Sequence, residues 1–199
     1  MSESRSDRVE AVIRRSMRQG IEVKERLLRE GLGAIVHLAL LLVDTFRAGH
    51  KVILFGNGGS AADAQHVAGE LIGRFLINRE ALPAIALTTD TSVLTAVGND
   101  FGFDQVFARQ VRALAQSGDV AVGISTSGNS PNVLLAIQAA KELGAATVGV
   151  SGANGGRLRE LADVCLCVPS EHTPAAQEAQ IAIWHAVCDV VERELFGSS

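Results

Sequence analysis

The segment DVAVGISTSGNSP, from Asp119 to Pro131, joins an apolar run to a turn that is rich in hydroxyl groups. The apolar run at residues 120–124 is typical of a buried strand, and a helical run begins at Asn132, directly after the turn. The turn therefore lies between a strand end and a helix N-terminus, where backbone N–H groups point outward and the helix dipole is positive. This arrangement predicts a binding site for an anion.

The composition of the turn indicates which anion it would bind. Four of its six residues from 125 to 130 carry hydroxyl groups that can donate hydrogen bonds: Ser125, Thr126, Ser127 and Ser130. The turn has no Lys or Arg and lacks the GxxxxGK[ST] spacing of nucleotide loops, so a sugar phosphate suits it better than a triphosphate with its metal ion. Serine-rich turns are usually caps without a ligand. This density of donors at a strand end nevertheless favours a phosphate site.

The rest of the chain repeats the alternation of short apolar runs and helical stretches. Strands are expected at residues 52–55, 84–87, 120–124, 147–150 and 164–168. Helices are expected at residues 61–77, 91–98, 105–115, 132–143 and 156–162, with a last helix at about 173–195 that Thr173 would cap. Strands that alternate with helices pair in parallel through right-handed crossovers. We therefore expect an α/β fold with a five-stranded parallel sheet between helix layers.

Two further helices are expected before the sheet, at residues 7–30 and about 34–48, with a glycine-rich break between them. Because no linker or repeat interrupts the chain, residues 1–199 are expected to form one domain. Its N-terminal helices would occupy residues 1–49, and the sheet and last helix residues 50–199. The apolar faces of the first two helices need a cover, either on the sheet or on a partner.

The overall composition excludes several classes of protein. The 199 residues are 47% apolar and carry a net charge of −4, which indicates a soluble globular protein and argues against nucleic acid as the principal partner. Residues 1–31 are too polar for a secretory signal, and the most apolar helix, residues 34–43, is too short to span a membrane. Cys165 and Cys167 have no second cysteine pair with which to form a thiolate zinc site. Reduced thiols fit a cytoplasmic protein.

A second loop, GNGGS at residues 56–60, follows the first expected strand and opens a helix. Its glycines would let a ligand approach the backbone, although the loop is a weak signal by itself because it does not match GxGxxG. Both loops should lie at the same sheet edge, where the carboxyl ends of parallel strands meet. On the helix that follows, His66 and Glu70 are four residues apart and share one face, which more often reflects a solvated contact than a functional pair.

The remaining polar candidates have ordinary explanations when taken alone. Gln177 and His185 are eight residues apart on the last helix, about 12 Å along an ideal helix, so their spacing does not identify them as ligands of one metal ion. A lone histidine beside Trp184 is more often packed in the core. Asn99 and Asp100 are typical turn residues.

Taken in order, the motifs GNGGS, DAQHVAGEL, TAVGNDFGF, ISTSGNSPN and QEAQIAIWH resemble those of the sugar isomerase (SIS) domain superfamily. Within it, the chain most resembles the bacterial sedoheptulose 7-phosphate isomerases, also called phosphoheptose isomerases, over essentially its whole length. The STSGNS loop marks only the superfamily, whereas the full set is specific. The resemblance implies a three-layer SIS sandwich that converts sedoheptulose 7-phosphate to D-glycero-D-manno-heptose 7-phosphate. It also implies a cytoplasmic homotetramer with one zinc ion per subunit.

The resemblance assigns roles to individual residues. Asn57, Gly58 and Gly59 match the first substrate loop, Asn99 and Asp100 the second, and Ser125, Thr126, Ser127 and Ser130 the phosphate loop. His66, Glu70, Gln177 and His185 match the metal ligands, Glu70 and Gln177 also match substrate contacts, and Arg74, one turn beyond Glu70, matches an arginine near the substrate. In the reaction, Glu70 would remove the carbon-bound proton and His185 would exchange protons with the sugar oxygens.

Two other functions stay open. A related SIS-fold branch binds the chromosomal replication initiator, but it lacks the glutamate and the last histidine of the metal set, which this chain keeps as Glu70 and His185. That branch also tends to have an arginine where this chain has Ser127. A sugar-phosphate-sensing module without catalysis would need the phosphate loop alone. Turnover of the sugar phosphate distinguishes the isomerase from both alternatives.

Overall fold

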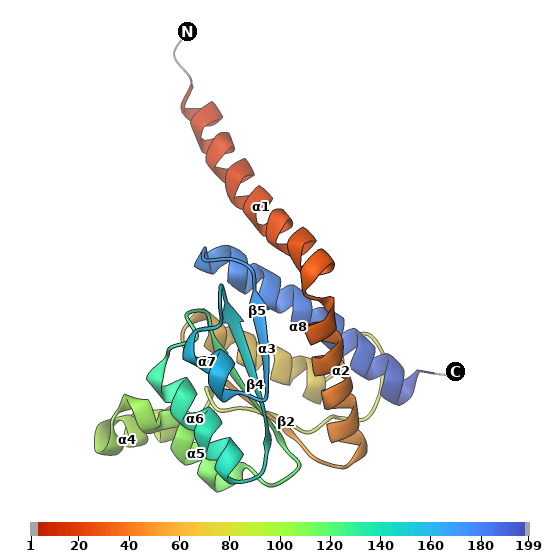
Figure 1. Cartoon of the computed structure of the whole chain (residues 1–199), viewed down its shortest axis with the longest axis vertical. Coiled ribbons are helices and arrows are strands. Elements are labelled where there is room, and N and C mark those ends of the chain that lie inside the picture. Colours follow the sequence, from red (N-terminus) through yellow and green to blue (C-terminus); the bar gives the residue numbers. More distant parts are fainter. Residues whose placement is uncertain (1–3, 198–199) are drawn as a thin grey trace.

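The computed structural model describes residues 4–197, and its centre is one five-stranded parallel sheet (Figure 1). The strands are β1 Val52–Gly56, β2 Ala84–Ala86, β3 Val120–Ser125, β4 Ala146–Gly152 and β5 Val164–Val168. They lie in the order β2-β1-β3-β4-β5, and Val52 of β1 is in register with Ala84 and with Val120. The predicted α/β class and the five-stranded parallel sheet are confirmed.

Helices cover both faces of the sheet, as a three-layer sandwich requires. They are α1 Arg5–Glu30, α2 Leu32–Arg47, α3 Gly59–Ile72, α4 Thr91–Phe101, α5 Val106–Leu114, α6 Pro131–Glu142, α7 Gly156–Leu161 and α8 Thr173–Phe196, with a 3₁₀ turn at Phe103–Gln105. One buried cluster joins α2, α3 and α8 to the face of β1 that carries Val52 and Leu54. A second cluster joins α5, α6 and α7 to the opposite face, which carries Ile53 and Phe55. Because β1 and β3 are buried on both faces, their sequences are continuous apolar runs.

The order of the strands determines where a ligand can bind. The chain passes from β1 to the edge strand β2 and then returns to β3 on the other side of β1. The loops that follow β1 and β3 therefore leave the sheet toward opposite faces, which makes this edge a topological switch point. Ligands of open α/β sheets bind at this kind of switch point. Both loops selected from the sequence, at residues 56–60 and 125–130, lie here.

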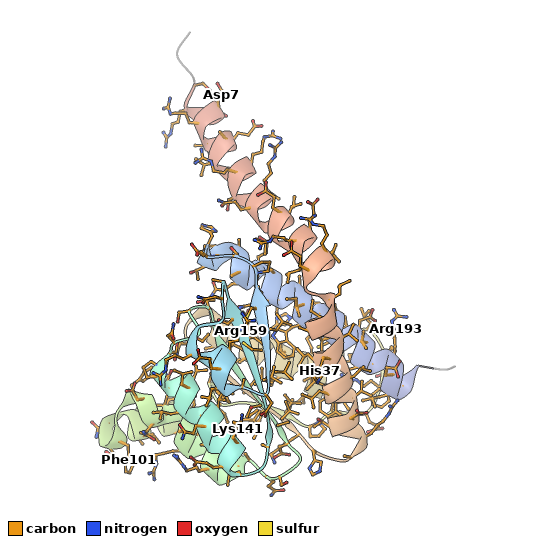
Figure 2. All side chains as sticks on the ribbon, viewed as in Figure 1. Asp7, His37, Phe101, Lys141, Arg159 and Arg193 are labelled. Atoms are coloured by element: carbon orange, nitrogen blue, oxygen red, sulfur yellow. The ribbon has the colours of Figure 1, made fainter. Side chains whose placement is uncertain are left out.

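The first helix, α1, extends away from the rest of the molecule (Figure 1). Near Asp7 its side chains point outward on all sides, and no other described element lies beside them (Figure 2). Its buried residues, Gly20, Val23 and Leu27, all lie in its C-terminal half, where it crosses α8. A Cβ on Gly20 would overlap the carboxylate of Glu178, and Lys24 donates to the same carboxylate at 2.6 Å. The N-terminal half of α1 has no cover from residues 4–197.

One helix is shorter than the sequence pattern predicts. The expected helix at residues 61–77 ends at Ile72. Two buried charged side chains bind the segment that follows and hold it outside the helix. Glu192 of α8 accepts backbone N–H groups of Phe75, Leu76 and Ile77 at 2.7–2.8 Å, and Arg79 donates to Glu192 at 3.0 Å. Arg79 also donates to the carbonyl oxygens of Glu70 and Leu71, so it closes the end of α3.

Two other boundaries differ from the prediction. The cap of α8 is His172, whereas Thr173 and Pro174 are already helical, so the predicted capping role of Thr173 is wrong. Gly31 is the single residue between α1 and α2, and Gly33 lies inside α2. No helix within residues 4–197 is both long enough and apolar enough to cross a membrane.

Candidate active site

The phosphate loop brings three of its four predicted hydroxyl groups together, those of Ser125, Ser127 and Ser130. Ser125 Oγ lies 2.9 Å from Ser130 Oγ and 3.4 Å from Ser127 Oγ, and the Asn129 backbone N–H donates to Ser127 Oγ at 3.2 Å. Ser130 is the N-cap of α6, and its hydroxyl makes no capping bond to the helix. The hydroxyls therefore converge at a helix N-terminus, where they suit a phosphate group.

A neighbouring turn holds this loop from behind. The backbone N–H groups of Gly152 and Leu158 donate to the carbonyl oxygens of Thr126 and Gly128 at 3.0 and 2.9 Å. Gly128 has a φ of +67°, and a Cβ there would overlap the carbonyl group of Gly155. Only glycine fits this backbone contact, so the loop is rigidly supported.

The first substrate loop connects to both the phosphate loop and α8. Asn57 and Asn132 exchange two side-chain hydrogen bonds of 2.9 Å, which join the loop after β1 to the first turn of α6. Gly58 has a φ of +55°, and a Cβ on Gly59 would overlap the carboxamide of Gln177. Sequence reasoning missed Asn132, which is 2% exposed; an amide in an otherwise apolar helical run was the available signal.

The second group of predicted residues forms a compact cluster between α3 and α8. His66 Nε2 lies 3.0 Å from His185 Nε2 and 3.2 Å from Glu70 Oε1. Among the described residues, these three side chains form a group of possible metal ligands whose donor atoms all lie within 4.8 Å of one another. Two imidazole nitrogens on one tetrahedral zinc ion stand about 3.3 Å apart, given Zn–N bonds of about 2.0–2.1 Å. The donor set and its spacing therefore fit zinc.

Gln177 lies with the substrate loop at Gly59, while His185 lies with His66. The helices α3 and α8 therefore run parallel to each other along this contact. The seven residues from Gly59 to His66 correspond to about 10 Å along α3. The role of Gln177 as a substrate contact is compatible with this position, and its role as a fourth metal ligand stays a prediction.

Three predicted residues lie outside both groups. Arg74 is exposed and follows the end of α3 at Gly73, so its predicted position one helical turn beyond Glu70 is wrong. The residues of the second substrate loop, Asn99 and Asp100, are exposed in the last turn of α4, where the Asn99 amide donates to Asp100 at 2.8 Å. Helix α4 packs on the opposite face of the sheet from α3 and α8. Within one chain, Asn99 and Asp100 therefore do not join the His66 cluster.

A further acidic residue on α3 was not selected from the sequence. Burial raises the pKa of the Asp63 carboxyl above its ordinary value, and a charge on His66 opposes this rise. Its Oδ2 atom is buried and accepts no hydrogen bond from the described part of the chain. On α8, the Gln180 amide and the indole N–H of Trp184 are also buried without a hydrogen-bond partner among the described residues. Buried polar atoms normally have partners. Both helices that supply the cluster therefore carry buried polar groups without a hydrogen-bond partner among the described residues, and the spacing Asp63–His66 was the available signal for Asp63.

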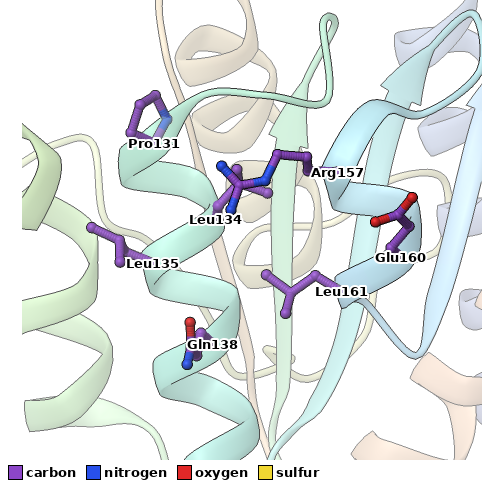
Figure 3. Close-up of a pocket in the computed structure, with 7 residues that line it drawn as sticks. All are labelled: Pro131, Leu134, Leu135, Gln138, Arg157, Glu160 and Leu161. Atoms are coloured by element: carbon purple, nitrogen blue, oxygen red, sulfur yellow. The ribbon is translucent and has the colours of Figure 1, made fainter.

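A cavity of about 350 Å³ lies between α6 and α7, beside the phosphate loop (Figure 3). It is lined by Pro131, Leu134, Leu135, Gln138, Arg157, Glu160 and Leu161. Pro131 directly follows Ser130, and the Arg157 backbone N–H donates to the Asn129 side chain at 3.1 Å, so the cavity adjoins the phosphate loop, whereas His66, Glu70 and His185 do not line it.

Comparison with known proteins agrees with this geometry. The family described as "SIS domain" matches residues 17–152. A phosphoheptose isomerase from Geobacter sp. (strain M21) is 55% identical over 184 residues, which cover 92% of this chain and 96% of the relative. The structure of phosphoheptose isomerase GmhA from Neisseria gonorrhoeae is 44% identical with a TM-score of 0.84, over 95% of this chain and 99% of that one. A phosphoheptose isomerase from Francisella tularensis is 36% identical with a TM-score of 0.87, over 96% and 100%.

Proposed function

This chain belongs to the phosphoheptose isomerase family of SIS-domain proteins, and from that premise we propose that it interconverts sedoheptulose 7-phosphate and D-glycero-D-manno-heptose 7-phosphate. One observation carries the proposal. A hydroxyl cradle lies at the start of α6, and a cluster of two imidazoles and one carboxylate lies on α3 and α8. The cradle suits the phosphate group, and the cluster suits proton transfer at the carbonyl end of the same sugar.

Aldose–ketose isomerisation moves one proton from C1 to C2 and another between the two oxygens, through an enediol. In our proposal, Glu70 accepts the proton from C1 of the ketose and returns it to C2. His185 gives a proton to the carbonyl oxygen and receives one from the neighbouring hydroxyl. The contact of His66 with both of these side chains supports their joint action. The phosphate loop contributes orientation, because it holds the far end of the sugar.

We propose zinc as the cofactor, bound by His66, Glu70, Gln177 and His185. When bound, it would supply Lewis acidity to the substrate carbonyl. Because a carboxylate on a metal ion is a weaker base, Glu70 would act on the carbon-bound proton only when it is not a ligand. The support for zinc is the spacing of the His66, Glu70 and His185 donor atoms.

Purified protein is expected to convert sedoheptulose 7-phosphate, and a chelator is expected to abolish the conversion until zinc is restored. The assay separates the product by ion-exchange chromatography, with the metal content measured in the same samples. Full turnover in chelated, metal-free protein would exclude the zinc role. Retention of a replication initiator without turnover would instead favour the regulatory branch, and sugar-phosphate binding without turnover would favour a sensing module.

We also propose that the protein is a homotetramer in the cytoplasm. All three cysteines are free, as is usual in a reducing compartment. The support for assembly is the apolar stripe on α1, whose exposed members include Val9, Val12, Ile13, Met17, Ile21 and Leu28. A stripe of this kind normally has a partner.

Light scattering is expected to give a mass of about four chains for the unchanged protein. Ile13→Glu is expected to lower that mass, because a charge in the middle of the stripe would have to be buried without a partner. Glu10→Gln, on the same helix but in an exposed pair with Arg14, is the matched control and should leave the mass unchanged. A single-chain mass for the unchanged protein would contradict the proposal.

A further inference from the structure

Two thiols lie side by side on the edge strand β5, outside the site described above. Cys165 and Cys167 are two residues apart and share one face, and their Sγ atoms are 3.7 Å apart. Neighbours on one face of a strand have Cα atoms about 6.6 Å apart, near the upper limit of about 6.8 Å for a disulfide. Their Cβ atoms are also about 6.6 Å apart, farther than the roughly 3.5–4.5 Å of a disulfide, so the bond can close only if β5 bends locally. Both side chains are half-buried, and neither takes part in the proposed reaction.

The surroundings of the pair leave room for movement. Strand β5 pairs with β4 alone, so its other edge is free within the described residues. Cys165 faces Gly149 of β4, where a Cβ would stand 3.1 Å from Cys165 Sγ. The Cys167 sulfur lies against Gly155, whose Cβ position is 2.7 Å from it. Glycine at both places leaves the space that the two sulfurs occupy, and the edge of β5 that is unpaired within residues 4–197 allows this strand to move.

The two sulfurs differ in acidity, so one is the natural nucleophile. A hydrogen bond from the Cys165 thiol lowers the pKa of Cys167 to about 7, with help from Arg159 of α7 (labelled in Figure 2) and against the effect of burial. The same interaction raises the pKa of Cys165. Burial, together with the charges of Glu70 and Glu192, raises the pKa of the remaining thiol, Cys188, to about 12. Since the thiolate is the reactive form, Cys167 should react and Cys188 should not.

We propose that Cys165 and Cys167 form a redox-active dithiol, which a hydroperoxide closes to a disulfide and which low-molecular-weight thiols reopen. The Cys167 thiolate attacks one oxygen of hydrogen peroxide, so that the O–O bond breaks, hydroxide leaves and Cys167 becomes a sulfenic acid. The Cys165 sulfur then attacks the Cys167 sulfur, the S–S bond forms, and the hydroxyl group leaves as water with the thiol proton. Two thiols are oxidised, and one peroxide is reduced to two waters.

The pair lies behind the phosphate loop, so formation of the disulfide should alter the position of that loop. The sulfurs must approach from 3.7 Å to about 2.05 Å. This movement changes the packing of Cys167 on Gly155, which itself packs directly on Gly128 of the phosphate loop. The Arg157 backbone N–H, in the next turn, also donates to the Asn129 side chain at 3.1 Å. We therefore expect the disulfide to weaken phosphate binding and not the chemical step, an effect that rests on the proposed function.

The first test is chemical and needs no activity. Protein treated with hydrogen peroxide is alkylated, digested with glutamyl endopeptidase and analysed by mass spectrometry. Cleavage after Glu160 and Glu171 releases residues 161–171 with both thiols, while Cys188 lies in the separate peptide 179–192. The expected result is that peptide 161–171 becomes two hydrogen atoms lighter and unalkylated, and that Cys188 stays alkylated. Faster oxidation of Cys188, a link between two chains, or a Cys167 sulfinic acid without a link would overturn the proposal.

The second test measures the effect on the phosphate loop. Oxidised protein is expected to show KM for sedoheptulose 7-phosphate raised roughly fivefold, the effect of one weakened hydrogen bond, with kcat unchanged. Dithiothreitol should reverse the change, and Cys165→Ser should abolish it. If that variant does not fold, the unchanged protein before and after dithiothreitol provides the same comparison. If the disulfide forms and KM stays unchanged, the proposed effect of the disulfide on the phosphate loop is overturned. If the reduced protein neither binds nor converts the sugar phosphate, the proposed function is wrong. In that case the peptide analysis alone tests whether Cys165 and Cys167 form a redox-active dithiol.

Discussion

Glu70→Gln is expected to lower kcat by about 10²–10⁴-fold, the usual contribution of a positioned general base, while sugar-phosphate binding stays measurable. Glutamine keeps the size of the side chain and its reach toward His66 but cannot accept a carbon-bound proton. Turnover is followed with sedoheptulose 7-phosphate, and binding by isothermal titration calorimetry with the same compound. Metal content is measured alongside, because Glu70 is also a proposed ligand, and this separates a lost base from a lost ligand.

Ser127→Ala is the matched comparison, since Ser127 belongs to the phosphate loop and not to the cluster. Loss of one hydroxyl donor should mainly raise KM, because the phosphate contact is the same in the ground state and the transition state. Glu70→Gln should therefore affect mainly kcat, and Ser127→Ala mainly KM. A wild-type rate in Glu70→Gln with full metal content would reject Glu70 as the base, and a fall in kcat alone in Ser127→Ala would reject the anchoring role.

The second large effect is on stability. Glu192→Ala is expected to lower the free energy of unfolding by about 3–5 kcal/mol, because it leaves the Arg79 charge buried without its partner. The side chains of both residues are 1% exposed, and three backbone N–H groups of residues 75–77 lose their acceptor at the same time. Urea unfolding followed by circular dichroism measures the change. Glu194→Gln, in the exposed pair with Arg47, is the control and should cost less than about 1 kcal/mol.

The same carboxylate makes stability depend on pH. Burial by itself would raise the pKa of Glu192, but the N–H groups of residues 75–77 and the charge of Arg79 outweigh it, so the pKa is lowered. The carboxylate therefore contributes its full stabilisation above its pKa in the unfolded chain, about 4.3, and loses it as the pH falls through the lower folded value. Unchanged protein should lose stability on acidification below about pH 4.3 more steeply than Glu192→Ala. Parallel curves for the two proteins would contradict this origin.

The elements that the sequence predicted well are those whose signals are local. Strands β1 and β3 are buried on both faces and read as apolar runs, and the phosphate loop carries its donors within six residues. The elements that it predicted poorly depend on distant contacts. Residues 73–77 continue a helical pattern, yet the pair of Glu192 and Arg79 holds them outside the helix. These two residues are 113 positions apart in the sequence, so their contact leaves no local signal. The meeting of His66 and His185 spans 119 residues, so no spacing rule could reveal it.

The exposed stripe on α1 has a consequence for the order in which the protein forms. The sheet and its helix layers close two buried clusters within one chain, so this body can fold as a unimolecular process. The N-terminal half of α1 stays exposed after that step, and in the homotetramer that we propose another subunit would cover it. Newly made chains therefore pass through a stage in which the apolar stripe of α1 is exposed to solvent. At this stage, correct assembly competes with aggregation, and the concentration of subunits sets the balance.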